Sequence, residues 1–205
     1  MMSGKLIILN GTSSSGKTSI ARCLQASWPT PLLYLSLDTA IGMMPFAYTG
    51  AGILAEDGYC LRSVIAGDEI VVTYSLGRHA RFLNSNLATM ADGLSAAGYD
   101  VIVDHVITDD ETMIDLAERV SGRSVFLIGV ICDKNILEQR ERLRGDRLIG
   151  LAAGQAQTVH CGHRPYGLVV DSTRATPDEL AEAIRRFVDS DPLNAFGRVI
   201  SNGYG

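Results

Sequence analysis

The stretch that decides the fold is Leu6-Ile7-Ile8-Leu9-Asn10-Gly11-Thr12-Ser13-Ser14-Ser15-Gly16-Lys17-Thr18. Its second half has the form G-x-x-x-x-G-K-[ST], which follows an apolar, strand-like run and precedes a helix-like segment. In this pattern the backbone N–H groups of a glycine-containing turn surround phosphate oxygens, and the positive end of the next helix attracts their charge. We expect Lys17 to reach the β- and γ-phosphates and the Thr18 hydroxyl to face Mg²⁺. The predicted nucleotide-binding residues are Gly11, Thr12, Ser13, Ser14, Ser15, Gly16, Lys17 and Thr18.

The alternative is a serine- and glycine-rich turn that only caps a helix. With glycine at about 7% of residues, a chance match in a chain of this length is on the order of one in a hundred. Lysine is scarce, since only Lys5, Lys17 and Lys134 occur. The motif therefore predicts binding of ATP or GTP.

Five continuous apolar runs recur along the chain, separated by helix-like stretches. Continuous rather than alternating runs are typical of strands covered on both faces, as in a parallel sheet. The alternation of strand and helix predicts an α/β architecture, a five-stranded parallel sheet with helices on both faces. The predicted strands are 6–9, 32–37, 101–103, 125–131 and 168–170, and the predicted helices are 18–26, 78–97, 111–120, 135–143 and 177–188.

Length and composition are those of one globular domain, residues 1–205. With 46% hydrophobic and 20% charged residues, the chain lies outside the range of disordered sequences. Its 18 basic and 23 acidic side chains give a net charge of −5, which has no general attraction for nucleic acid or an anionic membrane face. The tail, residues 190–205, is rich in Gly and Asn, so we expect it to be loosely packed.

The apolar runs are too short for a signal peptide or a membrane span. The longest, Val125 to Cys132, has eight residues, where a span needs about twenty. The four cysteines have no close paired spacing, which predicts reduced thiols. We therefore expect a cytoplasmic protein that binds neither nucleic acid nor membranes and that could form a homo-oligomer.

Among nucleotide-binding proteins, the sequence favours a small kinase. A GTPase switch needs an Asn-Lys-x-Asp motif, and no Asn-Lys dipeptide occurs. Motor ATPases usually close their second strand with an acidic pair, whereas here that run ends Val103-Asp104-His105. Asp104 follows an apolar strand, where parallel sheets place ligands, and its carboxylate could hold Mg²⁺ through water. The alternative is an aspartate that caps a helix or lies in a loop.

Asp38 ends the second apolar run, at the same edge of the sheet. An acceptor hydroxyl loses its proton as it attacks phosphorus, and a carboxylate within reach can orient it and receive that proton. Asp38 is thus a candidate catalytic base, and a cap formed by Asp38-Thr39 is the alternative.

The next stretch, 41–48, is apolar and aromatic. It either walls the site of a neutral, partly aromatic acceptor or belongs to the core.

An arginine cluster follows the fourth predicted strand: Arg140, Arg142, Arg144 and Arg147. On a helix, 140, 144 and 147 share one face while 142 points elsewhere. Guanidinium groups on one face could clamp a triphosphate and stabilise the transferring group when a lid, around residues 135–160, closes. Lys17, Arg144 and Arg147 are therefore candidate catalytic residues beside Asp38. The alternative is a solvated face balanced by three acidic neighbours, Glu138, Glu141 and Asp146.

The sequence His160-Cys161-Gly162-His163 has the spacing of metal ligands at first sight. A finger-like zinc site needs a second ligand pair at similar spacing, and none follows. We interpret this stretch as a loop with incidental His and Cys, with a zinc site as the alternative.

Several short sequence motifs are more specific to one family than the phosphate loop is. The main ones are Leu37-Asp38 with Met44-Pro45, and Arg144-Gly145-Asp146-Arg147. Together with Val101–Asp104, Gln155 and Val159-His160, they resemble the chloramphenicol 3-O-phosphotransferase family of P-loop kinases. The resemblance spans residues 6–173 and is weaker over 49–94, a region that helps to shape the acceptor pocket in such kinases.

The resemblance implies a three-layer, nucleoside-kinase-like fold, ATP and Mg²⁺ as cofactors, and transfer of the γ-phosphate to a primary hydroxyl of chloramphenicol, which would inactivate the antibiotic. It implies that Asp38 is the base. It further implies that Arg144 and Arg147 lie near the adenine and the phosphates.

The sequence therefore predicts an ATP-dependent kinase that phosphorylates a hydroxyl group of a neutral small molecule, chloramphenicol or a relative. A kinase of another small alcohol, a nucleotide sugar or a sugar acid is one alternative. An anionic acceptor would call for basic residues near the pocket, and 41–48 contains none. A nucleotide-binding module with little turnover is the other alternative, and it would not need a base, a phosphate loop and arginines together.

Overall fold

The computed structural model describes residues 3–66, 69–120, 122–144, 150–161 and 164–190. Its main sheet is parallel and has the strand order β2-β6-β1-β7-β8. This confirms the predicted five-stranded parallel sheet, and β1 at its centre leads into the phosphate loop. The strands are β1 (Lys5–Asn10), β2 (Leu32–Ser36), β6 (Asp100–His105), β7 (Ser124–Ile131) and β8 (Leu168–Asp171).

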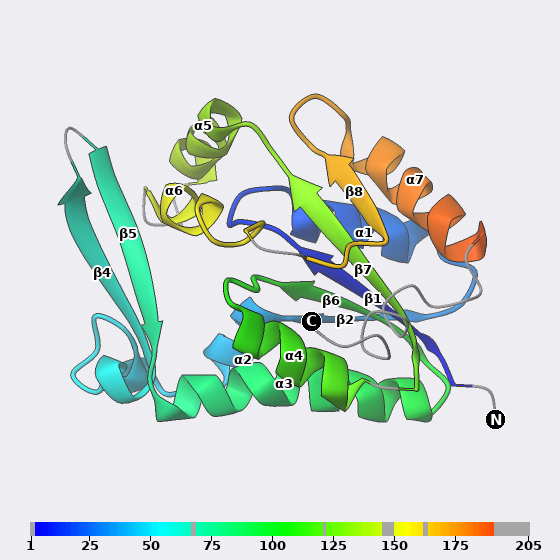
Figure 1. Ribbon diagram of the computed structural model, residues 1–205, viewed down its shortest axis with the longest axis horizontal. Coiled ribbons are helices and arrows are strands. Elements are labelled where there is room, and N and C mark those ends of the chain that lie inside the picture. The colour runs from blue at the N-terminus through cyan, green and yellow to red at the C-terminus, as the bar shows by residue number, and fades with distance from the viewer. Residues whose placement is uncertain (1–2, 67–68, 121, 145–149, 162–163, 191–205) are drawn as a thin grey trace.

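Helices cover both faces of this sheet (Figure 1). Successive side chains of a strand point to opposite faces. Leu6 and Ile8 accordingly pack with the helices of one face, while Ile7 and Leu9 pack with those of the other. Burial on both faces is why the run is continuously apolar. The first face carries α2 (Leu37–Gly42), α3 (Arg78–Ala96) and α4 (Asp110–Arg119), and the second carries α1 (Lys17–Ser27) and α7 (Pro177–Ser190).

A second, three-stranded sheet lies outside the main one, and the sequence pattern did not predict it. It has the order β3-β4-β5, with β4 and β5 forming an antiparallel hairpin. Figure 1 shows this hairpin at one end of the molecule, beside α6 (Leu151–Ala156). Polar residues such as Arg62 and Thr73 interrupt its strands, so no continuous apolar run marks them. The elements here are the short helices η1 (Phe46–Tyr48) and η2 (Ala55–Asp57) and the strands β3 (Thr49–Gly50), β4 (Tyr59–Ala66) and β5 (Glu69–Leu76).

Two helices follow β7, α5 (Lys134–Arg144) and α6, and a buried carboxylate joins them. Glu141 of α5 is fully buried and accepts hydrogen bonds from Gly150 N at 3.0 Å and Ala152 N at 2.6 Å. These N–H groups lie at the start of α6, where a helix leaves its donors unpaired. Glu141 is therefore part of the fold and does not belong to a solvated face.

The predicted lid, around residues 135–160, contains α5 and α6, and its movement stays a prediction. Residues 145–149 and, in the predicted loose tail, 191–205 lie outside the described residues. Val72 N of β5 donates to Gly150 O at 3.2 Å, so the hairpin is bonded directly to the start of α6. No helix in the described part of the chain is long and apolar enough to cross a membrane.

Replacing Glu141 with alanine is expected to lower the free energy of unfolding by about 2–5 kcal/mol, because two N–H groups lose a buried, charged acceptor. Urea denaturation measures this loss. Glu138→Ala on the same helix is the matched control, since the ion pairs of its carboxylate with described residues are longer, at 3.7 Å to Lys134 and 3.8 Å to Arg142. We expect a loss of less than about 1 kcal/mol there, and equal losses in the two variants would contradict the anchoring role.

Candidate active site

The phosphate loop turns tightly between β1 and α1. Gly16, the residue before α1, has a φ of 91°, and Ser14 has a φ of 60°. Backbone of this left-handed kind is easy for glycine and uncommon for serine. The Ser15 hydroxyl donates to Thr12 O at 2.9 Å, which holds the turn closed. The loop thereby wraps around the N-terminus of α1.

Two serine hydroxyls of this loop fit an anion. Ser13 Oγ and Ser14 Oγ are buried, and neither has a hydrogen-bond partner among the described residues. Buried polar atoms are nearly always partnered in folded proteins, so orphaned hydroxyls in a turn at a helix N-terminus suit the oxygens of a phosphate chain. The residues present therefore fit the triphosphate that the motif predicts.

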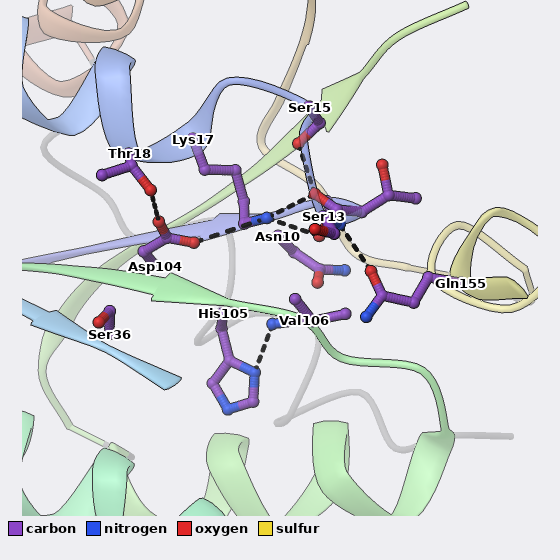
Figure 2. Close-up of polar contacts among 12 residues, drawn as sticks. Asn10, Ser13, Ser15, Lys17, Thr18, Ser36, Asp104, His105, Val106 and Gln155 are labelled. Atoms are coloured by element: carbon purple, nitrogen blue, oxygen red, sulfur yellow. Dashed lines mark hydrogen bonds and ion pairs between the residues drawn. The ribbon is translucent and has the colours of Figure 1, made fainter. Parts of the chain in front are cut away.

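Lys17, the first residue of α1, has a side chain only 6% exposed. Its Nζ donates to Gly11 O at 2.9 Å and Thr12 O at 2.7 Å, and lies 3.6 Å from Asp104 Oδ1 (Figure 2). A buried cation is costly unless it is paired and hydrogen-bonded, and these three oxygens meet that need. Its ammonium group is thus held inside the phosphate loop.

Asp104 ends β6 beside the phosphate loop (Figure 2). Its Oδ2 accepts from Thr18 Oγ1 at 2.8 Å and from the Tyr34 hydroxyl at 3.0 Å. Burial, followed by the Asp104 charge, raises the pKa of Tyr34, so the phenol stays a neutral donor. A carboxylate and a hydroxyl are oxygen ligands that suit Mg²⁺ alongside phosphates and water, so Thr18 and Asp104 fit the predicted metal. The capping role belongs to Asp109, whose Oδ1 accepts from Thr112 N at 2.7 Å.

Asp38 lies in the first turn of α2 with an exposed side chain. It lines a cavity of about 560 Å³ whose walls also include Lys17, Thr18 and Asp104. The N-cap of α2 is Ser36, whose hydroxyl accepts from Thr39 N at 3.0 Å. The capping role proposed for Asp38-Thr39 is therefore filled by Ser36, and the structure brings Asp38 to the same cavity as the phosphate loop.

Arg140 is the arginine of the predicted cluster that the structure places in the cavity. Its guanidinium donates to Ser172 O at 2.7 Å and Ser172 Oγ at 3.2 Å, and lies 3.5 Å from Ser14 O. The Ser172 hydroxyl in turn donates to Ser15 O at 2.7 Å. Arg140, one of the three arginines that the helical spacing places on one face, thus reaches the phosphate loop, although the family resemblance had indicated Arg144 and Arg147.

The other members of the cluster are Arg142, Arg144 and Arg147. Arg142 has an exposed side chain that pairs with Glu138, as expected for a residue on another face. The side chain of Arg144, at the end of α5, and the whole of Arg147 lie outside the described residues. Their contact with nucleotide stays a prediction.

Gln155 of α6 is a site residue that the sequence marked only through the family resemblance. Gln155 lines the cavity. Its Oε1 accepts from Ser13 N of the phosphate loop at 2.6 Å (Figure 2). The two residues are 142 positions apart in sequence. No local pattern in a six-residue helix indicates such a contact.

The apolar stretch 41–48 does not form the cavity wall as a unit, and it is not buried in the core as a unit either. Ile41 lines the cavity, but Met43 and Phe46 are 62% and 86% exposed. The aromatic residue on the cavity wall is Tyr59, the first residue of β4. Part of the cavity wall therefore comes from the hairpin that the sequence pattern did not predict.

His160 belongs to a hydrogen-bond network around the end of β1. Its Nδ1 is 2.9 Å from the Tyr166 hydroxyl, which accepts from Asn10 Nδ2 at 2.7 Å. Cys161 is exposed, and His163 lies outside the described residues. Within the described ranges, no three His, Cys, Asp or Glu side chains gather as a metal site would require. Through this network, His160 helps to hold β1 against the segment that follows α6.

Comparisons with known proteins agree with this geometry. Residues 4–189 match a family described as chloramphenicol phosphotransferase-like protein. Two strains of Mycobacterium tuberculosis contain a similar protein, provisionally named an O-phosphotransferase, which is 28% identical over 207 residues. The match covers 97% of this chain and 89% of that protein.

Solved structures of P-loop kinases are similar in fold. The APS kinase of Mycobacterium tuberculosis, in complex with AMPPNP and APS, has a TM-score of 0.65 at 16% identity, covering 93% of this chain and 100% of that one. The shikimate kinase of Acinetobacter baumannii, in complex with shikimate, has a TM-score of 0.60 at 14% identity, covering 94% and 97%. The three-layer kinase fold predicted from the sequence is confirmed.

The buried side chain of His105, next to Asp104, is expected to make the stability of the protein depend on pH. Its ring is buried, its Nδ1 accepts from Val106 N at 2.8 Å, and burial lowers its pKa to about 4. Between the ordinary pKa of about 6.5 and this value, the unfolded chain binds a proton that the folded chain does not. Stability is therefore expected to fall as the pH falls through this window, by up to roughly 3 kcal/mol.

Chemical denaturation between pH 7 and pH 4 measures this dependence. In His105→Asn the amide oxygen can accept the Val106 N–H without titrating, so the difference in slope between the two proteins isolates His105. Parallel slopes in both proteins would contradict the assignment.

Proposed function

The chain belongs to the chloramphenicol phosphotransferase-like family and is a P-loop kinase, and on that premise we propose that it transfers the γ-phosphate of ATP to a hydroxyl group of a neutral small molecule. Chloramphenicol or a related compound is the proposed acceptor. One observation carries the proposal: a single cavity is lined by the phosphate loop, by Asp104 and by Asp38. A phosphoryl donor and a base for the acceptor hydroxyl would meet there.

The acceptor end of the cavity supports a neutral acceptor. We define it by the lining residues Ser36, Leu37, Asp38, Ile41, Tyr59 and Val106. Asp38 is the one ionised side chain of this described set. A carboxylate or phosphate on the acceptor would approach the negative charge of Asp38, and like charges at close range disfavour binding. This observation speaks against a sugar acid or a nucleotide sugar, whereas another small alcohol stays compatible with it.

Each residue of the site then has a defined task. The loop N–H groups, with Lys17, hold the β- and γ-phosphates and balance their charge, and Thr18 and Asp104 hold Mg²⁺. Bound ATP supplies the phosphoryl group, whose bond to the leaving ADP breaks as the bond to the acceptor oxygen forms. Asp38 orients the acceptor hydroxyl and receives its proton. Stabilisation of the transferring group by Arg144 and Arg147 remains part of the proposal.

An acceptor screen tests the proposed function. The protein is incubated with ATP, Mg²⁺ and one alcohol at a time, beginning with chloramphenicol, and ATP consumption is measured together with mass spectrometry of the product. A phosphate ester of a neutral alcohol supports the proposal. Esters formed only from anionic alcohols would reject the neutral class, and ATP binding without any ester would favour the nucleotide-binding module.

Asp38→Asn tests the base. The substitution keeps the shape but removes the charge and basicity, so the rate of transfer is expected to fall by roughly 10²-fold or more. ATP affinity and melting temperature should hardly change, because Ser36 supplies the cap of α2. Asp57→Asn, an exposed carboxylate of η2 outside the cavity, is the control. Normal turnover in Asp38→Asn would remove Asp38 from the mechanism.

Arg140 and Arg142 provide a matched pair on one helix. Arg140 lines the cavity, while Arg142 pairs with Glu138 away from it. We expect Arg140→Ala to raise the KM for ATP about tenfold or more, since a charged hydrogen bond contributes on the order of 1.5–3 kcal/mol. Arg142→Ala should leave ATP kinetics near those of the wild type. The same KM in both variants would return Arg140 to a structural role.

A further inference from the structure

Tyr59 is the aromatic side chain at the acceptor end of the cavity. It begins β4, in the hairpin outside the main sheet, so neither the phosphate loop nor the strands that carry it determine its position. Its ring stacks on that of Tyr74 from β5, with centroids 5.6 Å apart and planes inclined by 24°. The ring of Tyr59 in the cavity wall is therefore backed by a second aromatic ring.

Tyr74 is held in place by a hydrogen bond. Its hydroxyl lies 3.0 Å from Thr108 Oγ1, a hydrogen bond between β5 and the segment that follows β6. Tyr74 does not line the main cavity. It lines a second hollow of about 360 Å³ between β5, α3 and α4. Tyr74 therefore contacts the ring of Tyr59 without itself lining the main cavity.

Three of the described residues that line the acceptor end together with Tyr59 are aliphatic. Leu37, Ile41 and Val106 line the same end of the cavity and are all half-buried, and Asp38 is the polar group that faces the reacting hydroxyl in the proposed function. A rigid aromatic face among aliphatic side chains suits a flat, uncharged group. Stacked or edge-to-face ring pairs contribute more than the apolar area that they bury.

We propose that Tyr59 determines acceptor specificity by packing its ring against a planar, unsaturated ring of the acceptor, and that Tyr74 is a positioning residue that holds Tyr59 in place. The proposal rests on the proposed function, because it assigns this end of the cavity to the acceptor. It adds a residue and a selection rule to that function. Among neutral alcohols, those with an aromatic ring near the hydroxyl are preferred over saturated ones of the same size.

Two alcohols that differ only in the ring make the test sharp. Benzyl alcohol and cyclohexylmethanol have the same connectivity, and only one is flat and aromatic. For each variant, kcat/KM for the two alcohols is measured by mass spectrometry of the phosphate esters, and their ratio is the readout. A general loss of folding or of ATP binding changes both values together and leaves the ratio unchanged.

Four variants separate the possible roles of the rings. In the wild type and in Tyr59→Phe we expect a ratio of about three to ten in favour of the aromatic alcohol, the range of a ring–ring contact. Tyr59→Leu keeps an apolar side chain but no ring, so the ratio should approach one. Tyr74→Leu should give an intermediate ratio. Tyr99→Leu, whose ring is exposed and outside the cavity, is the control and should match the wild type.

A wild-type ratio near one, or an unchanged ratio in Tyr59→Leu, would overturn the proposal. Failure of the proposed function has a different signature, because then neither alcohol is phosphorylated. In that case ligand-observed NMR compares binding of the same two alcohols to the ATP-loaded wild type and Tyr59→Leu. Preferential binding of the aromatic alcohol that disappears in Tyr59→Leu supports the role of Tyr59, and its absence overturns it.

Discussion

The contact between the phosphate loop and the end of β6 is the constraint on which the rest of the site depends. Lys17 is buried, and its charge is met by Gly11 O, Thr12 O and Asp104. Asp104 reaches this position because β1 and β6 run parallel with Leu9 opposite Asp104. A buried cation without these oxygens would be strongly unfavourable, so the loop, the central strands and the candidate metal site form one structural unit.

A second set of contacts joins the elements above the sheet to this unit. Glu141 binds the start of α6, Gln155 of α6 binds the Ser13 N–H of the loop, and Gly150 O accepts from Val72 of the hairpin. The hairpin that carries Tyr59 is thus connected through α6 to the phosphate loop. The hairpin beside the proposed acceptor and the phosphate loop that would hold the nucleotide are therefore connected by a short series of hydrogen bonds through α6.

The charge distribution within the cavity divides it into two chemical regions. Lys17 and Arg140 lie at the phosphate loop, where a triphosphate needs positive charge, whereas the acceptor end has Asp38 among uncharged side chains. The buried hydroxyls of Ser13 and Ser14 add donors at the first region. The proposed preference for a neutral alcohol over an anionic acceptor is based on this division, in a fold that other kinases use for other substrates.

By itself the sequence determined the layered sheet, the phosphate loop and the position of Asp104 near the end of a strand, whereas Asp38, predicted to end a strand, lies in the first turn of α2. These follow from short-range patterns, since apolar runs, helix periodicity and a loop motif are all read within a few residues. Only the tertiary structure decided that Ser36 rather than Asp38 caps α2 and that Arg140 reaches the loop. It also decided that Gln155 and Tyr59 line the cavity. Gln155 is 142 residues from its partner Ser13, and Tyr59 belongs to a hairpin interrupted by polar residues. Such positions depend on how distant elements pack, and local propensity does not encode that packing.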